Sequence, residues 1–462
     1  MDPLQQPELV AARRILARLA ANGHMAYLAG GAVRDLLLGL SPKDCDIATS
    51  ATPQHVLALF ERTFAVGAHF GVVLVVEEVE GQEIVTEVAT FRNDGAYSDG
   101  RHPDAVRYSS IPAEDVERRD FTINGLLLDL LQLPAKATVS VEQLRSVTLD
   151  FCGGIADLDS GIVRAIGDPL RRFEEDKLRM LRSVRFASRL NYAIDPATFT
   201  AIHGMVFSIA VVSQERVRDE LTRMLTEGHA RRAFELLDET CLLAAVLPEI
   251  SRLKGVEQPP QFHPEGDVWL HTLMLLEQLE AGCSDTLAWG ALLHDVGKPA
   301  TFRRAPDRIR FDGHVEIGVK IAAEITHRLR FSSEDSAQIA ALVENHMRFS
   351  DVQRMKQSTL KRFFRTRSFD EHLALHRMDC LASSGKLANW EYAREQFAML
   401  SSEVIRPKLL VDGRVLLEVG YQPGPGFRLM LQVAEDAQLE GTITTTAEGL
   451  SLIRKQFGPP IN

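Results

Sequence analysis

Residues 27–49, YLAGGAVRDLLLGLSPKDCDIAT, contain the features that decide the fold. A short apolar run ends in Gly30 and Gly31, and a helical pattern follows directly. Adjacent glycines let a backbone approach a bulky anion closely, and a helix that starts there presents free N–H groups. Arg34 adds a fixed positive charge. The segment therefore predicts a phosphate-binding turn.

The same segment ends in two carboxylates, Asp44 and Asp46. Residues two apart in a strand point to the same face, so we expect both side chains to share a face if residues 45–48 form a strand. Two adjacent carboxylates repel each other unless a cation lies between them, so the pair predicts a Mg²⁺ site. Together with the glycine turn, this site indicates phosphoryl-type chemistry on a nucleotide.

The order of these motifs is more specific than either motif alone, since a lone GG or a lone DxD occurs by chance in most long chains. The string GGxxRD, an apolar helix and then DxD resembles the nucleotidyltransferases that add CCA to tRNA and the bacterial poly(A) polymerases that share their head. The resemblance implies an α+β chain. Its small mixed α/β nucleotidyltransferase head would be followed by a mostly helical neck, an HD domain and a tail.

Length and composition set wider limits. At 462 residues the chain is too long for one core, so two to four domains are expected. The resemblance implies four parts: a head over 1–150, a base-recognition neck over 151–265, an HD phosphohydrolase-like domain over 266–400 and a helical tail over 401–462. No apolar stretch suits a bilayer, and the start lacks a signal-peptide core. Five cysteines without a CxxC spacing indicate neither a zinc knuckle nor a disulfide framework, so we expect a cytoplasmic protein.

Charge is unevenly distributed along the chain. The net charge of −11 argues against a protein covered in positive charge for nucleic acid. Arginines nevertheless gather in residues 164–189, and a second basic run covers residues 348–367. Each run predicts either a local basic surface or a solvated helix face.

Residues 72–76 and 83–91 are rich in β-branched residues and predict a hairpin. Glu87 lies in the middle of the second strand, where a carboxylate needs a reason. It is either a third carboxylate of a two-metal site or part of a solvated strand face. The segment EVATFR is similar to one in the CCA-adding family, and this resemblance favours the metal site.

Two further segments gain a role through the resemblance. In the similar enzymes, the part that corresponds to residues 92–117 is a mobile loop that helps to switch nucleotide preference. RRDFTING at 118–125 would otherwise be a helix start with a few polar residues. The resemblance implies that Arg119 binds phosphate and that Asp120 and Asn124 hydrogen-bond ribose hydroxyls.

The sequence from Glu174 onward predicts a helix that carries Asp176, Arg179 and Arg182 on one third of its circumference. An acid three residues before an arginine is most often a helix ion pair. The sharper hypothesis is a template for a base, because cytosine and adenine offer an amine to Asp176 and a ring nitrogen to Arg179. Uracil and guanine present a carbonyl that the carboxylate would repel. EDxxR resembles the base-recognition motif of the CCA-adding family, with Arg182 in support and QERVRDEL at 214–221 as its brace.

From residue 266 the order of histidines and aspartates predicts a second site. A lone histidine on an apolar helix is more often a core residue than a ligand. Here the order H…HD…H…H…D is complete, and imidazole and carboxylate suit a divalent metal. It resembles the HD phosphohydrolase domain. The resemblance implies the metal ligands His271, His294, Asp295 and Asp379, with His314 and His346 as candidates for a second metal or a phosphate, and Lys298 would suit a phosphate.

These patterns together predict a nucleotidyltransferase that adds C and A, from CTP and ATP, to the 3′ end of tRNA without a template. Mg²⁺ would act at the head, and an unidentified divalent metal would serve an HD phosphohydrolase activity. Three alternatives remain: an A-adding tRNA nucleotidyltransferase, a poly(A) polymerase, or a chain that is chiefly an HD metal-dependent phosphohydrolase. We expect no membrane and no obligate protein partner.

Overall fold

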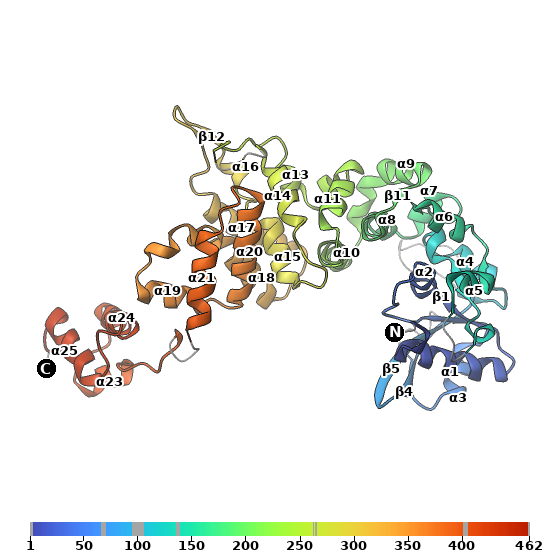
Figure 1. Ribbon diagram of the computed structural model, residues 1–462, viewed down its shortest axis with the longest axis horizontal. Helices are drawn as coiled ribbons and strands as arrows, with labels where there is room; N and C mark the ends of the chain where they lie inside the picture. Colours follow the sequence, from blue (N-terminus) through green and yellow to red (C-terminus); the bar gives the residue numbers. More distant parts are fainter. Residues whose placement is uncertain are drawn as a thin grey trace. The chain divides into compact units, whose positions relative to one another are not determined.

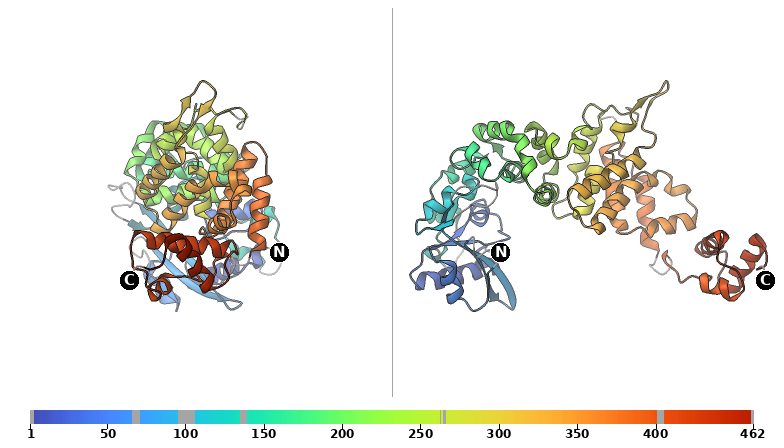
Figure 2. Two further views of the ribbon diagram at one scale, coloured as in Figure 1. Left: turned by 90° about the vertical axis from the view of Figure 1, so that its left-hand side faces the viewer. Right: turned by 180° about the vertical axis from the view of Figure 1, so that it is seen from behind.

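The computed structural model describes residues 3–65, 71–94, 106–134, 139–261, 263, 266–400 and 405–460. The chain forms two compact units, Met1–Pro248 and Glu249–Asn462, and Figures 1 and 2 show the elements of each. The division into four parts stays a prediction. Among the described residues, no helix has the combination of length and apolar character that crossing a bilayer requires.

The first unit begins with a mixed sheet of strand order β3-β4-β5-β2-β1-β8-β9. β2 and β5 run parallel, and the other neighbours are antiparallel. The strands are β1 (Ala26–Ala29), β2 (Ile47–Thr49), β3 (Thr63–Phe64), β4 (Val72–Val79), β5 (Gln82–Thr90), β8 (Leu126–Leu128) and β9 (Thr148–Asp150). A separate ribbon pairs β6 (Arg92–Asp94) with β7 (Val106–Tyr108).

β4 and β5 confirm the predicted hairpin, whose two long strands are visible in Figure 1. Val79 pairs with Gln82, so the loop consists of Glu80 and Gly81 alone. Both loop residues have positive φ, 52° and 80°. This conformation is that of a type I′ turn, whose twist matches the twist of the flanking strands. The nucleotide-switching loop expected over residues 92–117 lies partly outside the described residues.

Local sequence accounts for two helices of the head. α1 (Pro7–Ala21) is amphipathic, and its buried face packs against β1, β4 and β5. α3 (Pro53–Leu59) begins at a capped residue, because Thr52 accepts a hydrogen bond from the backbone N–H of His55. Between them, α2 (Gly31–Leu37) follows β1 directly.

Helices make up most of the rest of the first unit, and α8 packs against both α10 and α11. In chain order they are α4 (Pro112–Glu117), α5 (Val141–Ser146), α6 (Gly154–Ser160), α7 (Pro169–Glu175), α8 (Leu178–Leu190), α9 (Pro196–Met205), α10 (Gln214–Thr226), α11 (Ala230–Glu239) and α12 (Leu242–Val246). The parallel pair β10 (Ile162–Val163) and β11 (Ala193–Ile194) lies among them.

The expectation of one helix from Glu174 onward is wrong. Asp176 separates α7 from α8 and has an extended backbone, with φ −148° and ψ 107°. Its carboxylate accepts a hydrogen bond of 3.1 Å from the N–H of Leu178, and this local bond competes with a continuous helix. Leu181 and Val184 of α8 are fully buried.

The second unit is helical, and its core includes the buried rings of Phe349, Phe363 and Phe369. The helices are α13 (Pro248–Ser251), α14 (Val268–Leu276), α15 (Asp285–Leu293), α16 (Lys298–Thr301), α17 (His314–Arg328), α18 (Ser333–Asn345), α19 (Gln357–Phe364), α20 (Phe369–Ala382), α21 (Ala388–Met399), α23 (Gly413–Glu418), α24 (Pro425–Leu439) and α25 (Thr446–Phe457). A small hairpin joins β12 (Arg303–Arg304) to β13 (Ile309–Arg310).

The second basic run contributes contacts inside this unit. Arg362 forms ion pairs with Glu435 and Asp436 of α24, and Arg365 pairs with the same Glu435. Lys361 donates to the carbonyl of Leu439 at 2.6 Å. These cations therefore attach α24 to α19.

Candidate functional site

Three carboxylates of the head lie beside the central strands of the sheet. Asp44 and Asp46 immediately precede β2, so the strand begins later than the expected residue 45. In the parallel pair of β2 and β5, Ile47 is opposite Val88. Glu87 comes one residue earlier on β5, so the register brings it beside Asp46.

The charges of these carboxylates influence one another. Asp46 is exposed, yet the surrounding protein still desolvates its carboxylate. This desolvation and the charges of Glu87 and Asp44 raise the pKa of Asp46 to about 6, while Arg119 opposes the shift. Repulsion of this kind is relieved when a divalent cation binds. Carboxylate oxygens at an accessible edge are also the donors that a hard cation prefers.

The glycine turn lies next to a guanidinium. Gly30 has φ 68°, and a Cβ at this position would lie 3.1 Å from Nη1 of Arg119. Gly31 is the first residue of α2. Arg119 is held by Asp115, a fully buried carboxylate that also binds Arg118, at 3.0 and 2.6 Å respectively. Asp115 was not predicted from the sequence, although its spacing of three and four residues from two arginines was a signal.

The structure joins four predicted nucleotide-binding residues in one buried chain of contacts. Arg34 is 2% exposed, and it donates to Asn124 Oδ1 at 2.6 Å and to Asp35 Oδ1 at 2.7 Å. Asn124 in turn donates to Asp120 at 3.1 Å, and Arg182 Nη2 lies 2.7 Å from the same carboxylate. Burial alone would raise the pKa of Asp120, but Arg182 and Asn124 hold it at about 2.

Asp176 and Arg179 each form an ion pair with a different residue. Asp176 lies 2.7 Å from Nη2 of Arg216 in α10, a contact that agrees with a bracing role for that helix. Arg179 lies 2.7 Å from Glu175 and donates to the carbonyl of Arg118 at 3.0 Å. Both side chains are partly exposed and flank the break between α7 and α8.

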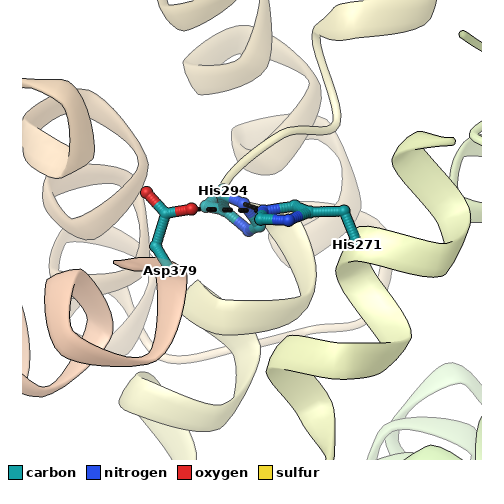
Figure 3. Close-up of side chains that lie close together, drawn as sticks. All are labelled: His271, His294 and Asp379. Carbon is teal, nitrogen blue, oxygen red and sulfur yellow. Dashed lines mark hydrogen bonds and ion pairs between the residues drawn. The ribbon is translucent and has the colours of Figure 1, made fainter. Parts of the chain in front are cut away.

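A second cluster gathers in the second unit, where side chains from three helical segments converge (Figure 3). His271 comes from α14, His294 follows α15, and Asp379 comes from α20. Nε2 of His271 lies 3.3 Å from Nε2 of His294 and 3.2 Å from Oδ1 of Asp379. The three ligand atoms could share one metal ion.

Asp295 connects this group to a second one. Its Oδ2 lies 3.1 Å from Nε2 of His294, while its Oδ1 lies 3.8 and 3.7 Å from Nε2 of His314 and His346. Asp295, His314 and His346 form the other triad that could hold a metal ion. Oδ2 of Asp295 thus faces His294 of the first triad, and its Oδ1 faces the two histidines of its own triad.

The imidazoles are oriented for metal binding. Nδ1 of His294, His314 and His346 lies 2.8, 2.9 and 2.7 Å from a backbone carbonyl three residues earlier. Donation to that carbonyl leaves the unprotonated Nε2 facing the cluster, as metal-binding histidines require. The buried Nε2 atoms of His314 and His346 have no hydrogen-bond partner among the described atoms. Burial lowers the pKa of His346 to about 4, so the ring is neutral at pH 7.

Lys298 has a different position from the one expected of a phosphate ligand. It is buried, and its Nζ lies 2.6 Å from Asp295 Oδ2 and 2.6 Å from Oε1 of Gln258. Burial alone would raise the pKa of Asp295, but Lys298 and His294 hold it well below its ordinary range. Lys298 therefore keeps the connecting carboxylate ionised.

Three regions of the chain match known protein families. Sequence profiles match residues 26–164 as a poly A polymerase head domain, 191–254 as a probable RNA and SrmB-binding site of polymerase A, and 267–381 as an HD domain. The CCA-adding enzyme of Latilactobacillus sakei subsp. sakei is 35% identical over 296 residues, which are 63% of this chain and 70% of that enzyme. The chain belongs to the CCA-adding enzyme family.

Other members of the CCA-adding enzyme family support the assignment. The enzyme of Lacticaseibacillus paracasei is 40% identical over 241 residues, or 52% of this chain and 56% of that enzyme. The chain spans about half to two thirds of the length of the first curated relatives it matches. The crystal structure of the Bacillus stearothermophilus CCA-adding enzyme in complex with CTP has a TM-score of 0.71 and 26% identity, covering 98% of each chain. The family resemblance and the α+β fold predicted from the sequence are confirmed.

Proposed function

We propose that this chain adds C and A, from CTP and ATP, to the 3′ end of tRNA. The observation that carries the proposal is the group of Asp44, Asp46 and Glu87 beside the glycine turn of a CCA-adding family head. The relatives named CCA-adding enzymes and the similar structure with CTP support the same substrates. The proposed compartment is the cytoplasm, on the sequence argument alone.

The reaction would be attack of the RNA 3′-hydroxyl on the α-phosphate, with pyrophosphate leaving. Asp44 and Asp46, assisted by Glu87, would hold Mg²⁺, which when bound supplies charge neutralisation and lowers the pKa of the attacking hydroxyl. Arg119, which lies beside Gly30, would bind the triphosphate. Gly31 opens the helix whose N–H groups face that turn.

The ribose would be held by Asp120 and Asn124. Because the pKa of Asp120 is about 2, its carboxylate is ionised at neutral pH and can accept hydrogen bonds from ribose hydroxyls. Arg34 would act indirectly, since its guanidinium donates a hydrogen bond to Asn124 and adds positive potential to the site.

Base selection is assigned to Asp176 and Arg179, with Arg182 in support. A carboxylate and a guanidinium side by side accept the amine and donate to the ring nitrogen of cytosine or adenine. In the free protein these groups bind Arg216 and Glu175. A base would bind beside these contacts or in place of them, since both side chains are partly exposed.

A second activity, hydrolysis of a phosphate ester, is proposed for the second unit. Two triads, connected by the contact of Asp295 with His294 and lined by imidazole Nε2 atoms directed inward, fit divalent metal ions. The triads are His271, His294 and Asp379, and Asp295, His314 and His346. The metal would supply an activated water at neutral pH.

The test uses one tRNA transcript that ends before CCA, after C, or after CC, with CTP, ATP or both. Completion of CCA from all three ends, and no further extension, is the expected result. Extension only of the CC end would make the protein an A-adding enzyme, and long A tails would make it a poly(A) polymerase. A protein that extends none of them but hydrolyses phosphate esters with added metal would be chiefly an HD phosphohydrolase. The variant His271→Ala, run in parallel, separates the two activities.

A further inference from the structure

We infer that Phe186 is a positioning residue that couples the phosphate side of the nucleotide site to its base-selecting side. The inference rests on the proposed function of the head. It concerns how that site keeps its phosphate-binding and base-selecting residues at a fixed distance. Phe186 lies in α8 and is 5% exposed, so it contacts no solvent-borne ligand directly.

Three guanidiniums surround the ring of Phe186. The Cζ atoms of Arg34, Arg182 and Arg185 lie 5.2, 5.3 and 4.3 Å from the ring centre. The face of an aromatic ring carries negative charge density and attracts a desolvated cation. Arg34 belongs to α2, whereas the other two belong to α8. The ring therefore draws a cation of the phosphate-side helix towards the base-side helix.

Carboxylates fix these cations from several elements. The pairs are Arg34 with Asp35 at 2.7 Å, Arg182 with Asp120 at 2.7 Å, and Arg185 with Glu220 of α10 at 2.6 Å. Three ion pairs thus converge on one apolar ring. Phe121 lies edge-on to Phe186, with ring centres 5.7 Å apart.

Two polar routes also join α2 to α8 around the ring. Asp35 Oδ2 lies 3.3 Å from Arg189, at the end of α8. The other route passes from Arg34 through Asn124 and Asp120 to Arg182. These routes and the ring form a closed circuit, because the ring contacts Arg34 and Arg182, the two ends of the second route. An aliphatic side chain would fill the same space without attracting the guanidiniums.

The circuit matters for selection because α2 and α8 serve opposite ends of a nucleotide. α2 begins at the turn assigned to the triphosphate, and α8 begins beside Asp176 and carries Arg179. A correct base holds its α-phosphate in line only if the two helices keep a fixed distance. A wrong base is held by its triphosphate alone, so it gains less from that distance. Loss of the ring should therefore reduce discrimination.

The experiment measures single-nucleotide addition of CTP and of UTP to tRNA lacking CCA. For Phe186→Leu we expect kcat/KM for CTP to fall roughly 10- to 100-fold, mainly in kcat, the scale of a small misplacement of reacting groups. The ratio of kcat/KM for CTP to that for UTP should fall about tenfold, whereas Phe186→Tyr, which keeps the ring, should retain the ratio. The ratio does not depend on the fraction of folded protein.

Phe234→Leu is the matched control, because Phe234 is fully buried in α11, which packs against α8. It should lower stability and leave the ratio unchanged. If Phe186→Leu leaves the ratio unchanged, or if Phe186→Tyr loses it equally, the inference is wrong while CCA addition stands. If the wild-type protein adds no nucleotide, the proposed function fails and the inference fails with it.

Discussion

The head and the second unit both gather carboxylates, but they hold them in opposite ways. In the head, Asp46 is exposed and is repelled by its neighbours, which raises its pKa to about 6. In the second unit, Asp295 and Asp379 have lowered pKa values despite burial, because cations and imidazoles surround them. The head site is therefore unfavourable without a cation, whereas the second site is largely built before a metal arrives.

The difference matches the chemistry proposed for each site. A nucleotidyltransferase can receive its cation together with each triphosphate, so an open and mutually repelling set of carboxylates is sufficient. A resident metal centre needs fixed tautomers and second contacts, which the carbonyl bonds of His294, His314 and His346 supply. Four experiments test whether the two sites differ in this way.

The largest effect is expected from Asp46→Asn. We predict a fall in the kcat of nucleotide addition of roughly 1,000-fold, the upper scale for loss of one electrostatic stabiliser. Thermal stability should be unchanged or higher, because a repelled charge is removed. Glu83→Gln, an exposed change on the same strand β5, is the control and should keep full activity. A stable Asp46→Asn protein with full activity would contradict the assignment.

The second prediction concerns Asp295→Asn in the second unit. Losing the connecting carboxylate should weaken metal binding about 100-fold or more, beyond the loss seen for supporting contacts. Metal content after dialysis against a first-row divalent metal measures this, with exposed Asp312→Asn as the control. Nucleotide addition should stay within about twofold of wild type, since the two sites share no residue. A parallel loss of nucleotide addition would show that the sites are coupled.

In a thermal scan, added metal should raise the unfolding temperature of the second unit more than that of the head. A divalent metal at 100 times its Kd stabilises the folded state by about 2.7 kcal/mol, so the transition of the second unit should rise by about 5–10 °C. A chelator should reverse the rise, and His271→Ala should prevent most of it. Mg²⁺ without a triphosphate should move the head transition much less. Equal shifts of both transitions would contradict the proposed difference.

The smallest effect concerns Asp120 at low pH. Its folded pKa of about 2 lies below the ordinary value of 3.8, so the stability it contributes is present above pH 4 and is lost as the pH falls through 2. The contribution is about 2 kcal/mol at neutral pH. In urea unfolding, wild type and Asp120→Asn should therefore differ most above pH 4 and converge towards pH 2. Asp219→Asn, an exposed change, should follow the wild-type curve.

The sequence predicted features that depend on neighbours in the chain. The hairpin of β4 and β5 follows from residues within a few positions of one another, and it is confirmed. The family and the helical second unit also followed from ordered motifs. The roles of the individual site residues stay predictions for the experiments above.

Partners that are distant in the chain were not predictable in the same way. Helical spacing suggested that Asp176 pairs with Arg179, but Asp176 accepts a hydrogen bond from the N–H of Leu178 and pairs with Arg216, which is 40 residues away. Lys298 likewise bound Gln258, 40 residues earlier. Periodicity gives the direction of a side chain, whereas the competing partner depends on which elements pack together.

The ion pairs that attach α24 to α19 would limit any contribution of the basic run over residues 348–367 to RNA binding. Cations gain affinity for RNA largely by releasing the ions condensed on phosphates, about 0.7 ion for each phosphate of a single strand. Arg362 and Arg365 already bind Glu435, so a phosphate could recruit them only by displacing an internal anion. The salt dependence of RNA binding should therefore be shallower than the number of basic residues in 348–367 suggests.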